Sequence, residues 1–311
     1  MKNHKSEFPD SSIAAAETEN TAAEETRADS STAGMLYICA TPIGNLDDIT
    51  YRVLECLRSV DVIAAEDTRN SIKLLNHFEI KTPMTSYHEF NKYDKAEYLV
   101  REMKSGKNIA IITDAGTPCI SDPGEELVRQ AAAAGITVTS LPGPSALVTA
   151  LTLSGLSTRR FAFEAFLPQD KKERARILDG LRTETRTMIL YEAPHRLVRT
   201  LNDLSAALGA DRPVSLCREL TKKHEEILRT TLGEALLRYG NEAPRGEYVL
   251  VVEGKTFEAL DTEAQASWAQ LTIAEHMQKY LSEGMPEKDA MKQVAKDRGI
   301  AKRDIYNEWK R

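Results

Sequence analysis

The chain has 311 residues, which is enough for two or three domains and for a core that needs no disulfide bonds. Apolar residues make up 41% and charged residues 28% of it, as in an ordinary globular protein. The formal net charge is −6, so the surface as a whole does not attract a polyanion such as a nucleic acid. Four widely spaced cysteines without a C-x-x-C pair exclude a zinc knuckle and a disulfide framework, and they favour a cytoplasmic protein. No long apolar run and no basic-then-apolar leader occurs, so we expect neither a membrane span nor export.

The N-terminal half begins with a tail and continues as alternating strands and helices. Residues 1–34 contain few large apolar side chains and predict a disordered, acidic tail. From residue 35 on, short apolar runs alternate with amphipathic stretches, which predicts a parallel sheet covered on both faces in an α/β domain over 35–152. The predicted strands are 36–40, 62–65, 84–87, 109–113 and 137–141, and the predicted helices are 49–58, 69–78, 92–104 and 124–134.

A second α/β domain is predicted over 153–256, followed by a small helical module over 265–311. Within the second domain the stretch 217–231 is typical of a hairpin, so its sheet should be mixed. The module is predicted to form short helices around turns at 284–286 and Gly299, in a helix-turn-helix-like pattern with eight basic and five acidic residues from Met285 on. The predicted strands of the second domain are 160–166, 187–191, 214–218, 226–231 and 248–253, and its helices are 171–181, 196–207 and 233–239.

Three loops rich in glycine and proline follow strands of the first domain, where parallel sheets bind ligands. They read A-T-P-I-G-N-L-D-D, T-D-A-G-T-P-C-I-S-D-P-G and L-P-G-P-S-A. None is a dinucleotide or triphosphate fingerprint, and the first loop alone is more typical of a plain turn. Together the loops predict a narrow slot where backbone groups approach a compact ligand. Asp114 at a strand end is the binding candidate there, whereas Asp122 before Pro123 predicts a helix cap.

The ordered segments A-T-P-I-G-N-L-D-D-I-T, A-E-D-T-R, D-A-G-T-P-C-I-S-D-P-G, L-P-G-P-S-A and Y-E-A-P-H-R-L resemble the ribosomal RNA small subunit methyltransferase I family of the tetrapyrrole-methylase superfamily, from about residue 36 to 254. The resemblance implies two α/β domains of tetrapyrrole-methylase type with a cofactor cleft between them, in a homodimer. It also implies S-adenosylmethionine-dependent 2′-O-methylation of a cytidine ribose in the decoding region of 16S rRNA, either as naked rRNA or as the assembled 30S subunit. The cofactor-binding residues that it implies are Pro42, Asp114, Ala115, Gly116, Thr117, Pro118, Ser145, Ala146, Tyr191, Glu192, Ala193, Arg245, Gly246 and Glu247.

A ribose hydroxyl is a poor nucleophile until a base or a polarising group lies beside it. Strand-end candidates for that role are Glu66 with Asp67, and His88 with Asn91. For the acidic pair a structural explanation is equally good, with Asp67 capping the next helix and Glu66 pairing with Arg69. His88 and Asn91 suit orientation of the acceptor better than proton abstraction. No metal site is expected.

Binding of RNA requires local positive charge, because the total charge is negative. Residues 156–230 contain 15 basic and 11 acidic side chains, and the terminal module adds a second small excess, although a solvated helix face explains any single residue as well. Two alternative functions stay open. One is a precorrin-type tetrapyrrole C-methyltransferase, which the A-T-P-I-G turn disfavours because such enzymes usually have G-x-G-P-G there. The other is a non-catalytic RNA-binding factor.

Overall fold

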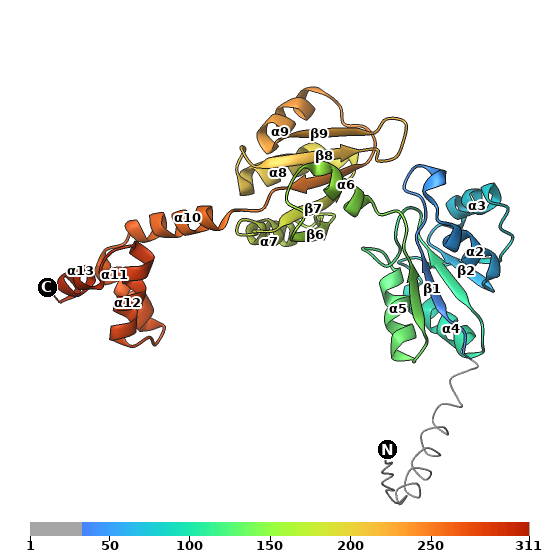
Figure 1. Ribbon diagram of the computed structural model, residues 1–311, viewed down its shortest axis with the longest axis horizontal. Coiled ribbons are helices and arrows are strands. Elements are labelled where there is room, and N and C mark those ends of the chain that lie inside the picture. The colour runs from blue at the N-terminus through green and yellow to red at the C-terminus, as the bar shows by residue number, and fades with distance from the viewer. Residues whose placement is uncertain (1–32, 311) are drawn as a thin grey trace, which may run out of the picture. The chain divides into compact units, whose positions relative to one another are not determined.

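The computed structural model describes residues 33–310, so residues 1–32 of the predicted tail lie outside the described residues. The chain divides into two compact units, one ending at Ala146 and the other beginning at Leu147 (Figure 1). This division precedes the predicted domain boundary at residue 152, and it places the terminal helices in the second unit. Gly34, the last residue of the predicted tail, donates its backbone N–H to the carbonyl of Met103 over 2.8 Å. Gly34, which the prediction assigned to the tail, is therefore part of the fold.

The first unit is a five-stranded sheet in the order β3-β2-β4-β1-β5, and every neighbouring pair is parallel, which confirms the prediction. Its elements differ from the predicted ones by at most two residues at either end. The strands are β1 Leu36–Cys39, β2 Val62–Ala65, β3 Met84–Ser86, β4 Ile109–Ile112 and β5 Val138–Leu141. The helices are α2 Tyr51–Ser59, α3 Thr68–His77, α4 Lys92–Lys104 and α5 Gly124–Ala133, and a 3-10 turn, η1, covers Leu46–Asp48.

Both faces of this sheet are buried, and the central strand β4 shows why its sequence is apolar throughout. Ile109 and Ile111 pack in one cluster with side chains of α4 and α5. Ala110 and Ile112 point to the other face and pack with α2 and α3. A strand covered on both sides loses the alternation of polar and apolar residues, and β4 accordingly reads I-A-I-I.

The second unit contains a mixed sheet, as predicted. Its strand order is β6-β7-β10-β8-β9, and only β6 and β7 run parallel. The predicted hairpin is formed by β8 and β9. The strands are β6 Phe161–Ala165, β7 Thr187–Glu192, β8 Pro213–Arg218, β9 Glu226–Thr231 and β10 Tyr248–Val252. The helices of this part are α6 Ala146–Ser154, α7 Lys171–Leu181, α8 Pro194–Leu208 and α9 Leu232–Asn241.

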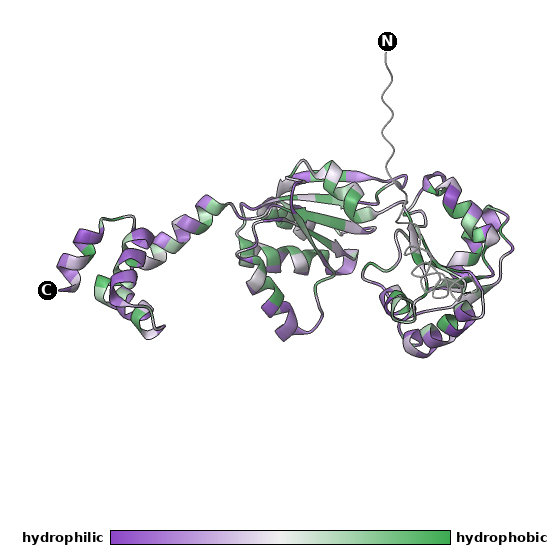
Figure 2. Cartoon of the chain, turned by 60° about the horizontal axis from the view of Figure 1, so that its bottom comes forward, coloured by the Kyte–Doolittle hydropathy of each residue, from purple (hydrophilic) through white to green (hydrophobic). Residues whose placement is uncertain are grey.

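The core of the second unit lies between its sheet and the helices α7, α8 and α9. Leu190 and Leu250 of the strands pack there with Leu197 and Leu201 of α8, and all four are buried. The apolar strands appear as green runs between helices whose outer faces are purple (Figure 2). On the opposite face the Sγ of Cys217 approaches the carbonyl of Ala150 in α6. Helices thus contact this sheet from both sides.

Four helices complete the chain: α10 Phe257–Ala269, α11 Ile273–Ser282, α12 Glu287–Arg298 and α13 Lys302–Trp309. The turns predicted at 284–286 and at Gly299 separate the last three, and Gly299 has a left-handed φ of 64°. Ile273, Met277, Val294 and Ile305 form a small core of their own. Helix α10 was not predicted, and it buries none of its described side chains.

Candidate functional site

The three glycine- and proline-rich loops of the first unit meet at the carboxyl edge of its sheet. They follow β4, β1 and β5, which are neighbours in that order. Thr41 and Gly116 exchange two backbone hydrogen bonds of 2.9 and 3.0 Å, which ties the first loop to the second. The hydroxyl of Thr117 donates to the carbonyl of Pro144 over 3.0 Å, which ties the second loop to the third. The prediction that these loops gather at one edge of the sheet is therefore confirmed, and we call this edge the rim.

Two glycines allow the loops to approach at backbone distance. Gly116 has a φ of +83°, and a Cβ placed there would lie 3.3 Å from the side chain of Ile43. A Cβ at Gly143 would lie only 2.8 Å from the Cβ of Ala40. Any other residue at Gly143 would push the third loop away from the first. Such close, rigid backbone suits the recognition of a compact ligand.

Among the residues predicted to bind the cofactor in this unit, Asp114 and Ala115 are exposed, whereas Pro42, Gly116 and Pro118 are buried. The remaining three, Thr117, Ser145 and Ala146, are half-buried.

Asp114 has a partner that the sequence analysis missed. Asn70, in the first turn of α3, donates through Nδ2 to Oδ2 of Asp114 over 3.0 Å. Thr41 was missed as well: it is buried, and its hydroxyl donates to the carbonyl of Thr113 over 3.1 Å. The only local signal for Asn70 was its place in a helix that begins at the same rim.

The loop after β4 is held in a strained conformation. Cys119 and Ser121 have positive φ values of 68° and 61°, which non-glycine residues adopt only where the surroundings impose them. Asp122 imposes part of this geometry, because its carboxylate accepts from the backbone N–H of Cys119 over 2.8 Å and from that of Gly124 over 2.7 Å. The predicted cap is wrong by one position, because Pro123 is the N-cap of α5, although the Asp122 carboxylate does accept from the first backbone N–H of that helix. Burial raises the pKa of the Cys119 thiol to about 12, so that it stays protonated and is a poor nucleophile.

The acidic pair after β2 divides into two roles. Asp67 accepts from the backbone N–H of Arg69 over 2.8 Å at the start of α3, and its other oxygen lies 2.7 Å from the guanidinium of Arg69. The capping explanation for Asp67 is confirmed, and Arg69 pairs with Asp67 rather than with Glu66. Arg69 lowers the pKa of Asp67 to about 2, which makes it a weak base at neutral pH. Glu66 instead accepts from the hydroxyl of Thr113 over 2.6 Å, next to Asp114.

The turn after β3 lies on the same rim. Tyr87 donates its backbone N–H to Ala65 over 2.8 Å and its hydroxyl to the carbonyl of Pro123 over 3.0 Å. Asn91 binds the backbone of His88: its Oδ1 accepts from the backbone N–H of His88 over 2.8 Å and closes the turn. The ring Nδ1 of His88 is buried and has no hydrogen-bond partner among residues 33–310. A role of these two residues in orienting an acceptor stays a prediction.

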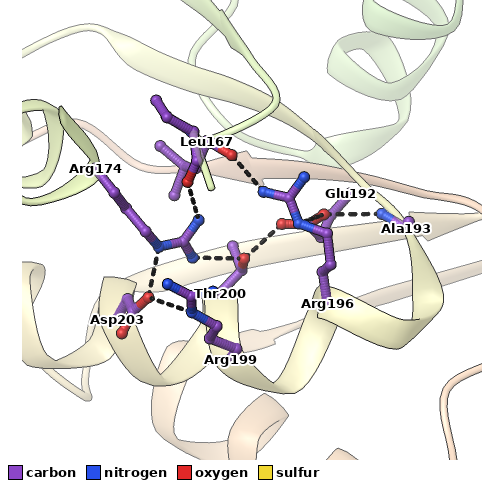
Figure 3. Close-up of polar contacts among 9 residues, drawn as sticks. Leu167, Arg174, Glu192, Ala193, Arg196, Arg199, Thr200 and Asp203 are labelled. Carbon is purple, nitrogen blue, oxygen red and sulfur yellow. Dashed lines mark hydrogen bonds and ion pairs between the residues drawn. The ribbon is translucent and has the colours of Figure 1, made fainter. Parts of the chain in front are cut away.

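In the second unit, the predicted segment Tyr191–Ala193 ends β7, and the carboxylate of Glu192 is used inside the protein (Figure 3). This side chain is fully buried. It accepts from the hydroxyl of Thr200 and from the backbone N–H of Ala193 over 2.9 Å, and it lies 3.3 Å from Nε of Arg196. Its side chain therefore stabilises the start of α8, which leaves only backbone groups of this residue for a ligand.

The same network continues to Arg174, which is 3% exposed. Its guanidinium donates to the hydroxyl of Thr200 over 2.8 Å, to Asp203 over 2.7 Å and to the carbonyl of Pro168 over 3.4 Å (Figure 3). The buried charge of Arg174 is tolerated because each of its three guanidinium nitrogens donates a hydrogen bond. The network joins α7 to α8 beneath the end of β7.

The ring of Tyr191 packs edge-on against two phenylalanines, with centroid distances of 4.9 Å to Phe163 and 5.7 Å to Phe166. Burial raises the pKa of its hydroxyl. An aromatic surface therefore lies beside the predicted segment.

The turn Arg245–Glu247 is built around a tight approach to Glu219. Gly246 has a φ of +78°, and a Cβ there would lie 2.5 Å from Cγ of Glu219. Glu219 accepts from the backbone N–H of Glu247 over 2.9 Å, and Lys222 lies 3.0 Å from Glu219 and 2.8 Å from Glu247. Arg245 is exposed. Binding of a cofactor by this turn stays a prediction.

Three further properties concern residues 33–310 only. In that part of the chain no group of three His, Cys, Asp or Glu side chains is placed to hold a metal ion. The four cysteines are all free thiols. Among the helices described there, none has the length and apolar character needed to cross a membrane.

Comparison with known proteins gives a consistent picture. The family model "Tetrapyrrole (Corrin/Porphyrin) Methylases" matches residues 35–236. A protein of Halalkalibacterium halodurans named "Ribosomal RNA small subunit methyltransferase I" is 50% identical over 275 residues, which covers 88% of this chain and 94% of that protein. The protein of the same name from Bacillus subtilis is 46% identical, covering 89% and 94%. Among solved structures, a diphthine synthase matches with a TM-score of 0.58 at 16% identity, covering 74% of this chain and 95% of that one. The uroporphyrin-III-C-methyltransferase of Thermus thermophilus matches with a TM-score of 0.51 at 19% identity, covering 70% and 94%. These two structures agree in fold.

Proposed function

Because the chain belongs to the tetrapyrrole methylase family, and within it to the ribosomal RNA small subunit methyltransferase I group, we propose that it methylates the ribose 2′-oxygen of a cytidine in small-subunit rRNA, with S-adenosylmethionine as donor. The observation that carries this proposal is the meeting of three loops at the rim of the first sheet, tied by Thr41, Gly116 and Thr117.

The rim fits the donor in its chemistry. When bound, S-adenosylmethionine supplies a methyl group on a positively charged sulfur, so that its transfer to an oxygen leaves a neutral thioether. The backbone of the tied loops holds the shape of the slot, which is the main contribution that such a reaction needs from a protein. The exposed carboxylate of Asp114, steadied by Asn70, is an acceptor for hydroxyl or ammonium groups of a ligand.

Activation of the ribose hydroxyl is assigned to Glu66. Of the two acidic residues after β2, Asp67 is occupied by Arg69 and has a pKa of about 2, whereas Glu66 lies at the strand end and accepts from Thr113. The Thr113 hydrogen bond fixes the Glu66 carboxylate while leaving further acceptor capacity for the hydroxyl of a substrate. The proton of the 2′-hydroxyl passes to this carboxylate as the oxygen attacks the methyl carbon.

RNA contact is assigned to the terminal helices as well as to the rim. Lys288, Lys292 and Lys296 are exposed and follow each other at helical spacing on α12, and Lys302 and Arg303 begin α13. Within the described chain no carboxylate lies within ion-pair distance of these five cations, whereas Lys310 pairs with Glu287. Exposed cations on α12 and at the start of α13 suit the phosphates of RNA, whose counterions they displace.

The test is methyl transfer in vitro from labelled donor to assembled 30S subunits, to naked 16S rRNA and to a corrinoid precursor. We expect label in RNA, at a ribose, and its loss in the Glu66→Gln and Asp114→Asn variants, with Asp211→Asn, an exposed carboxylate of the second unit, as control. Calorimetry should show that Asp114→Asn weakens donor binding and that Glu66→Gln does not. Label in the corrinoid alone would overturn the proposal in favour of a tetrapyrrole enzyme, and absence of donor binding would favour a non-catalytic RNA-binding factor. We further propose a homodimer, which sedimentation can test.

A further inference from the structure

The ring of Phe90 stands in solvent on a turn that is otherwise firmly held. Phe90 is 97% exposed, between β3 and α4. The turn around it is closed by the hydrogen bonds between His88 and Asn91. Tyr87, just before this turn, is also anchored: its backbone N–H donates to the carbonyl of Ala65, and its hydroxyl donates to the carbonyl of Pro123. Because the exposed ring of Phe90 buries no apolar surface, it does not stabilise the fold. We therefore consider this ring as a contact for a binding partner.

The place of this turn is the acceptor end of the rim. Strand β3 neighbours β2, whose end carries Glu66. The hydroxyl of Tyr87 reaches Pro123 in the loop after β4, the loop that contains Asp114. The ring of His88 lies edge-on to that of Phe90, with centroids 6.1 Å apart. Phe90 and the orphaned Nδ1 of His88 thus belong to the same turn beside the proposed acceptor base.

The charged side chains next to Phe90 pair with each other, and this limits the kind of ligand that the turn can attract. Glu89 pairs with Lys92 at 2.6 Å, and the ammonium of Lys92 also lies 5.3 Å from the ring centre of Tyr93. No excess of cations therefore attracts a phosphate to this turn. An exposed aromatic ring without surrounding positive charge binds a ligand by stacking on a flat aromatic face. Every nucleobase has such a face.

We propose that Phe90 stacks on an unpaired nucleobase of the RNA acceptor and so positions the target ribose at the rim. This inference rests on the proposed function and deepens it, because it identifies the substrate as RNA with an unstacked base at the methylated site. A base in intact A-form duplex has both faces covered by its neighbours, so it cannot meet the ring.

The experiment compares Phe90→Ala with the parent chain on 30S subunits or 16S rRNA, whichever the parent methylates. Loss of one stacking contact should raise KM for RNA by about 5- to 150-fold, while the Kd of the donor stays unchanged. Phe90→Trp should retain the parent KM, and Phe90→Leu should lie between, since leucine is apolar without an aromatic face. The matched control is Phe257→Ala, a 62% exposed phenylalanine at the start of α10, which should leave KM unchanged.

Salt dependence separates stacking from phosphate binding. The slope of log Kd for RNA against log salt concentration should be the same in Phe90→Ala as in the parent, because binding of the ring releases no counterion. The Kd should rise by the same factor at every salt concentration. An unchanged KM in Phe90→Ala overturns the inference while the activity of the parent upholds the proposed function. A change of oligomeric state in Phe90→Ala also overturns it, and would assign the ring to contact with a second copy of the chain. If the parent methylates no RNA, the proposed function fails, and the inference fails with it.

Discussion

Replacement of Glu192 by alanine should destabilise the second unit strongly, although the family resemblance implied a cofactor role for this residue. The parent carboxylate is fully buried, accepts from Thr200 and Ala193, and lies 3.3 Å from Arg196. Removing one partner of a buried ion pair costs about 3–5 kcal/mol. Arg196 is 19% exposed and keeps its hydrogen bond to the carbonyl of Leu167, so we expect the lower end, about 3 kcal/mol.

Urea unfolding of the full chain measures this loss. With a slope of about 2 kcal/mol per molar urea, a loss of about 3 kcal/mol lowers the midpoint for the second unit by roughly 1.5 M. The control is Glu242→Ala, because Arg238 and Glu242 have the same four-residue spacing and the same 3.3 Å separation, but the Glu242 side chain is 63% exposed. That variant should lose at most about 1 kcal/mol. An unchanged midpoint in Glu192→Ala together with a weaker donor Kd would refute the internal role and restore the cofactor role.

Three further outcomes follow from contacts described above. Gly143→Ala places a Cβ 2.8 Å from that of Ala40, so calorimetry should show weaker donor binding, by about tenfold or more, whereas Gly180→Ala, which meets no atom within 4 Å, should bind normally. An NMR titration should find the pKa of Asp67 near 2, and Arg69→Gln should return it toward 3.8. Since the folded-state pKa is lowered, this pair stabilises the fold fully above about pH 4 and loses its effect as the pH falls toward 2; an ordinary pKa in the parent would contradict the pairing. Replacing the three α12 lysines with glutamine should reduce the salt slope of RNA binding by roughly 2 to 3, and an unchanged slope would remove these helices from the RNA interface.

The fold could be predicted largely from the sequence because its signals are local. Strand β4 reads as one apolar run since both of its faces are covered, and the turns around it carry glycine and proline where the chain reverses. The mixed character of the second sheet followed from the short connection between β8 and β9. Helix α10 escaped prediction because none of its described side chains is buried, so no apolar stripe marks it.

The site could be predicted only in part, because its pairings depend on sheet register. Asn70 meets Asp114 across 44 positions of sequence, and Thr113 meets Glu66 across 47, and neither pair has a local signature. Local reasoning correctly offered Asp67 as a helix cap, but it could not choose between that and catalysis. For Asn91 it paired the residue with His88 but gave no contact, and the structure joins the two through the Asn91 amide oxygen and the backbone N–H of His88.

Two main-chain hydrogen bonds join Thr41 to Gly116, and the Thr41 hydroxyl adds a longer contact of 3.5 Å to the Gly116 carbonyl. Mutation of surrounding side chains leaves such a clasp in place, whereas the turn after β3 owes its character to a histidine and a phenylalanine that single codon changes can replace. The loop end of the rim thus tolerates many side-chain changes except at its glycines, whereas the turn after β3 changes its surface with each substitution of these two residues. A lineage built on this plan can vary the surface of the turn after β3 while the bonded backbone of the first two loops stays the same.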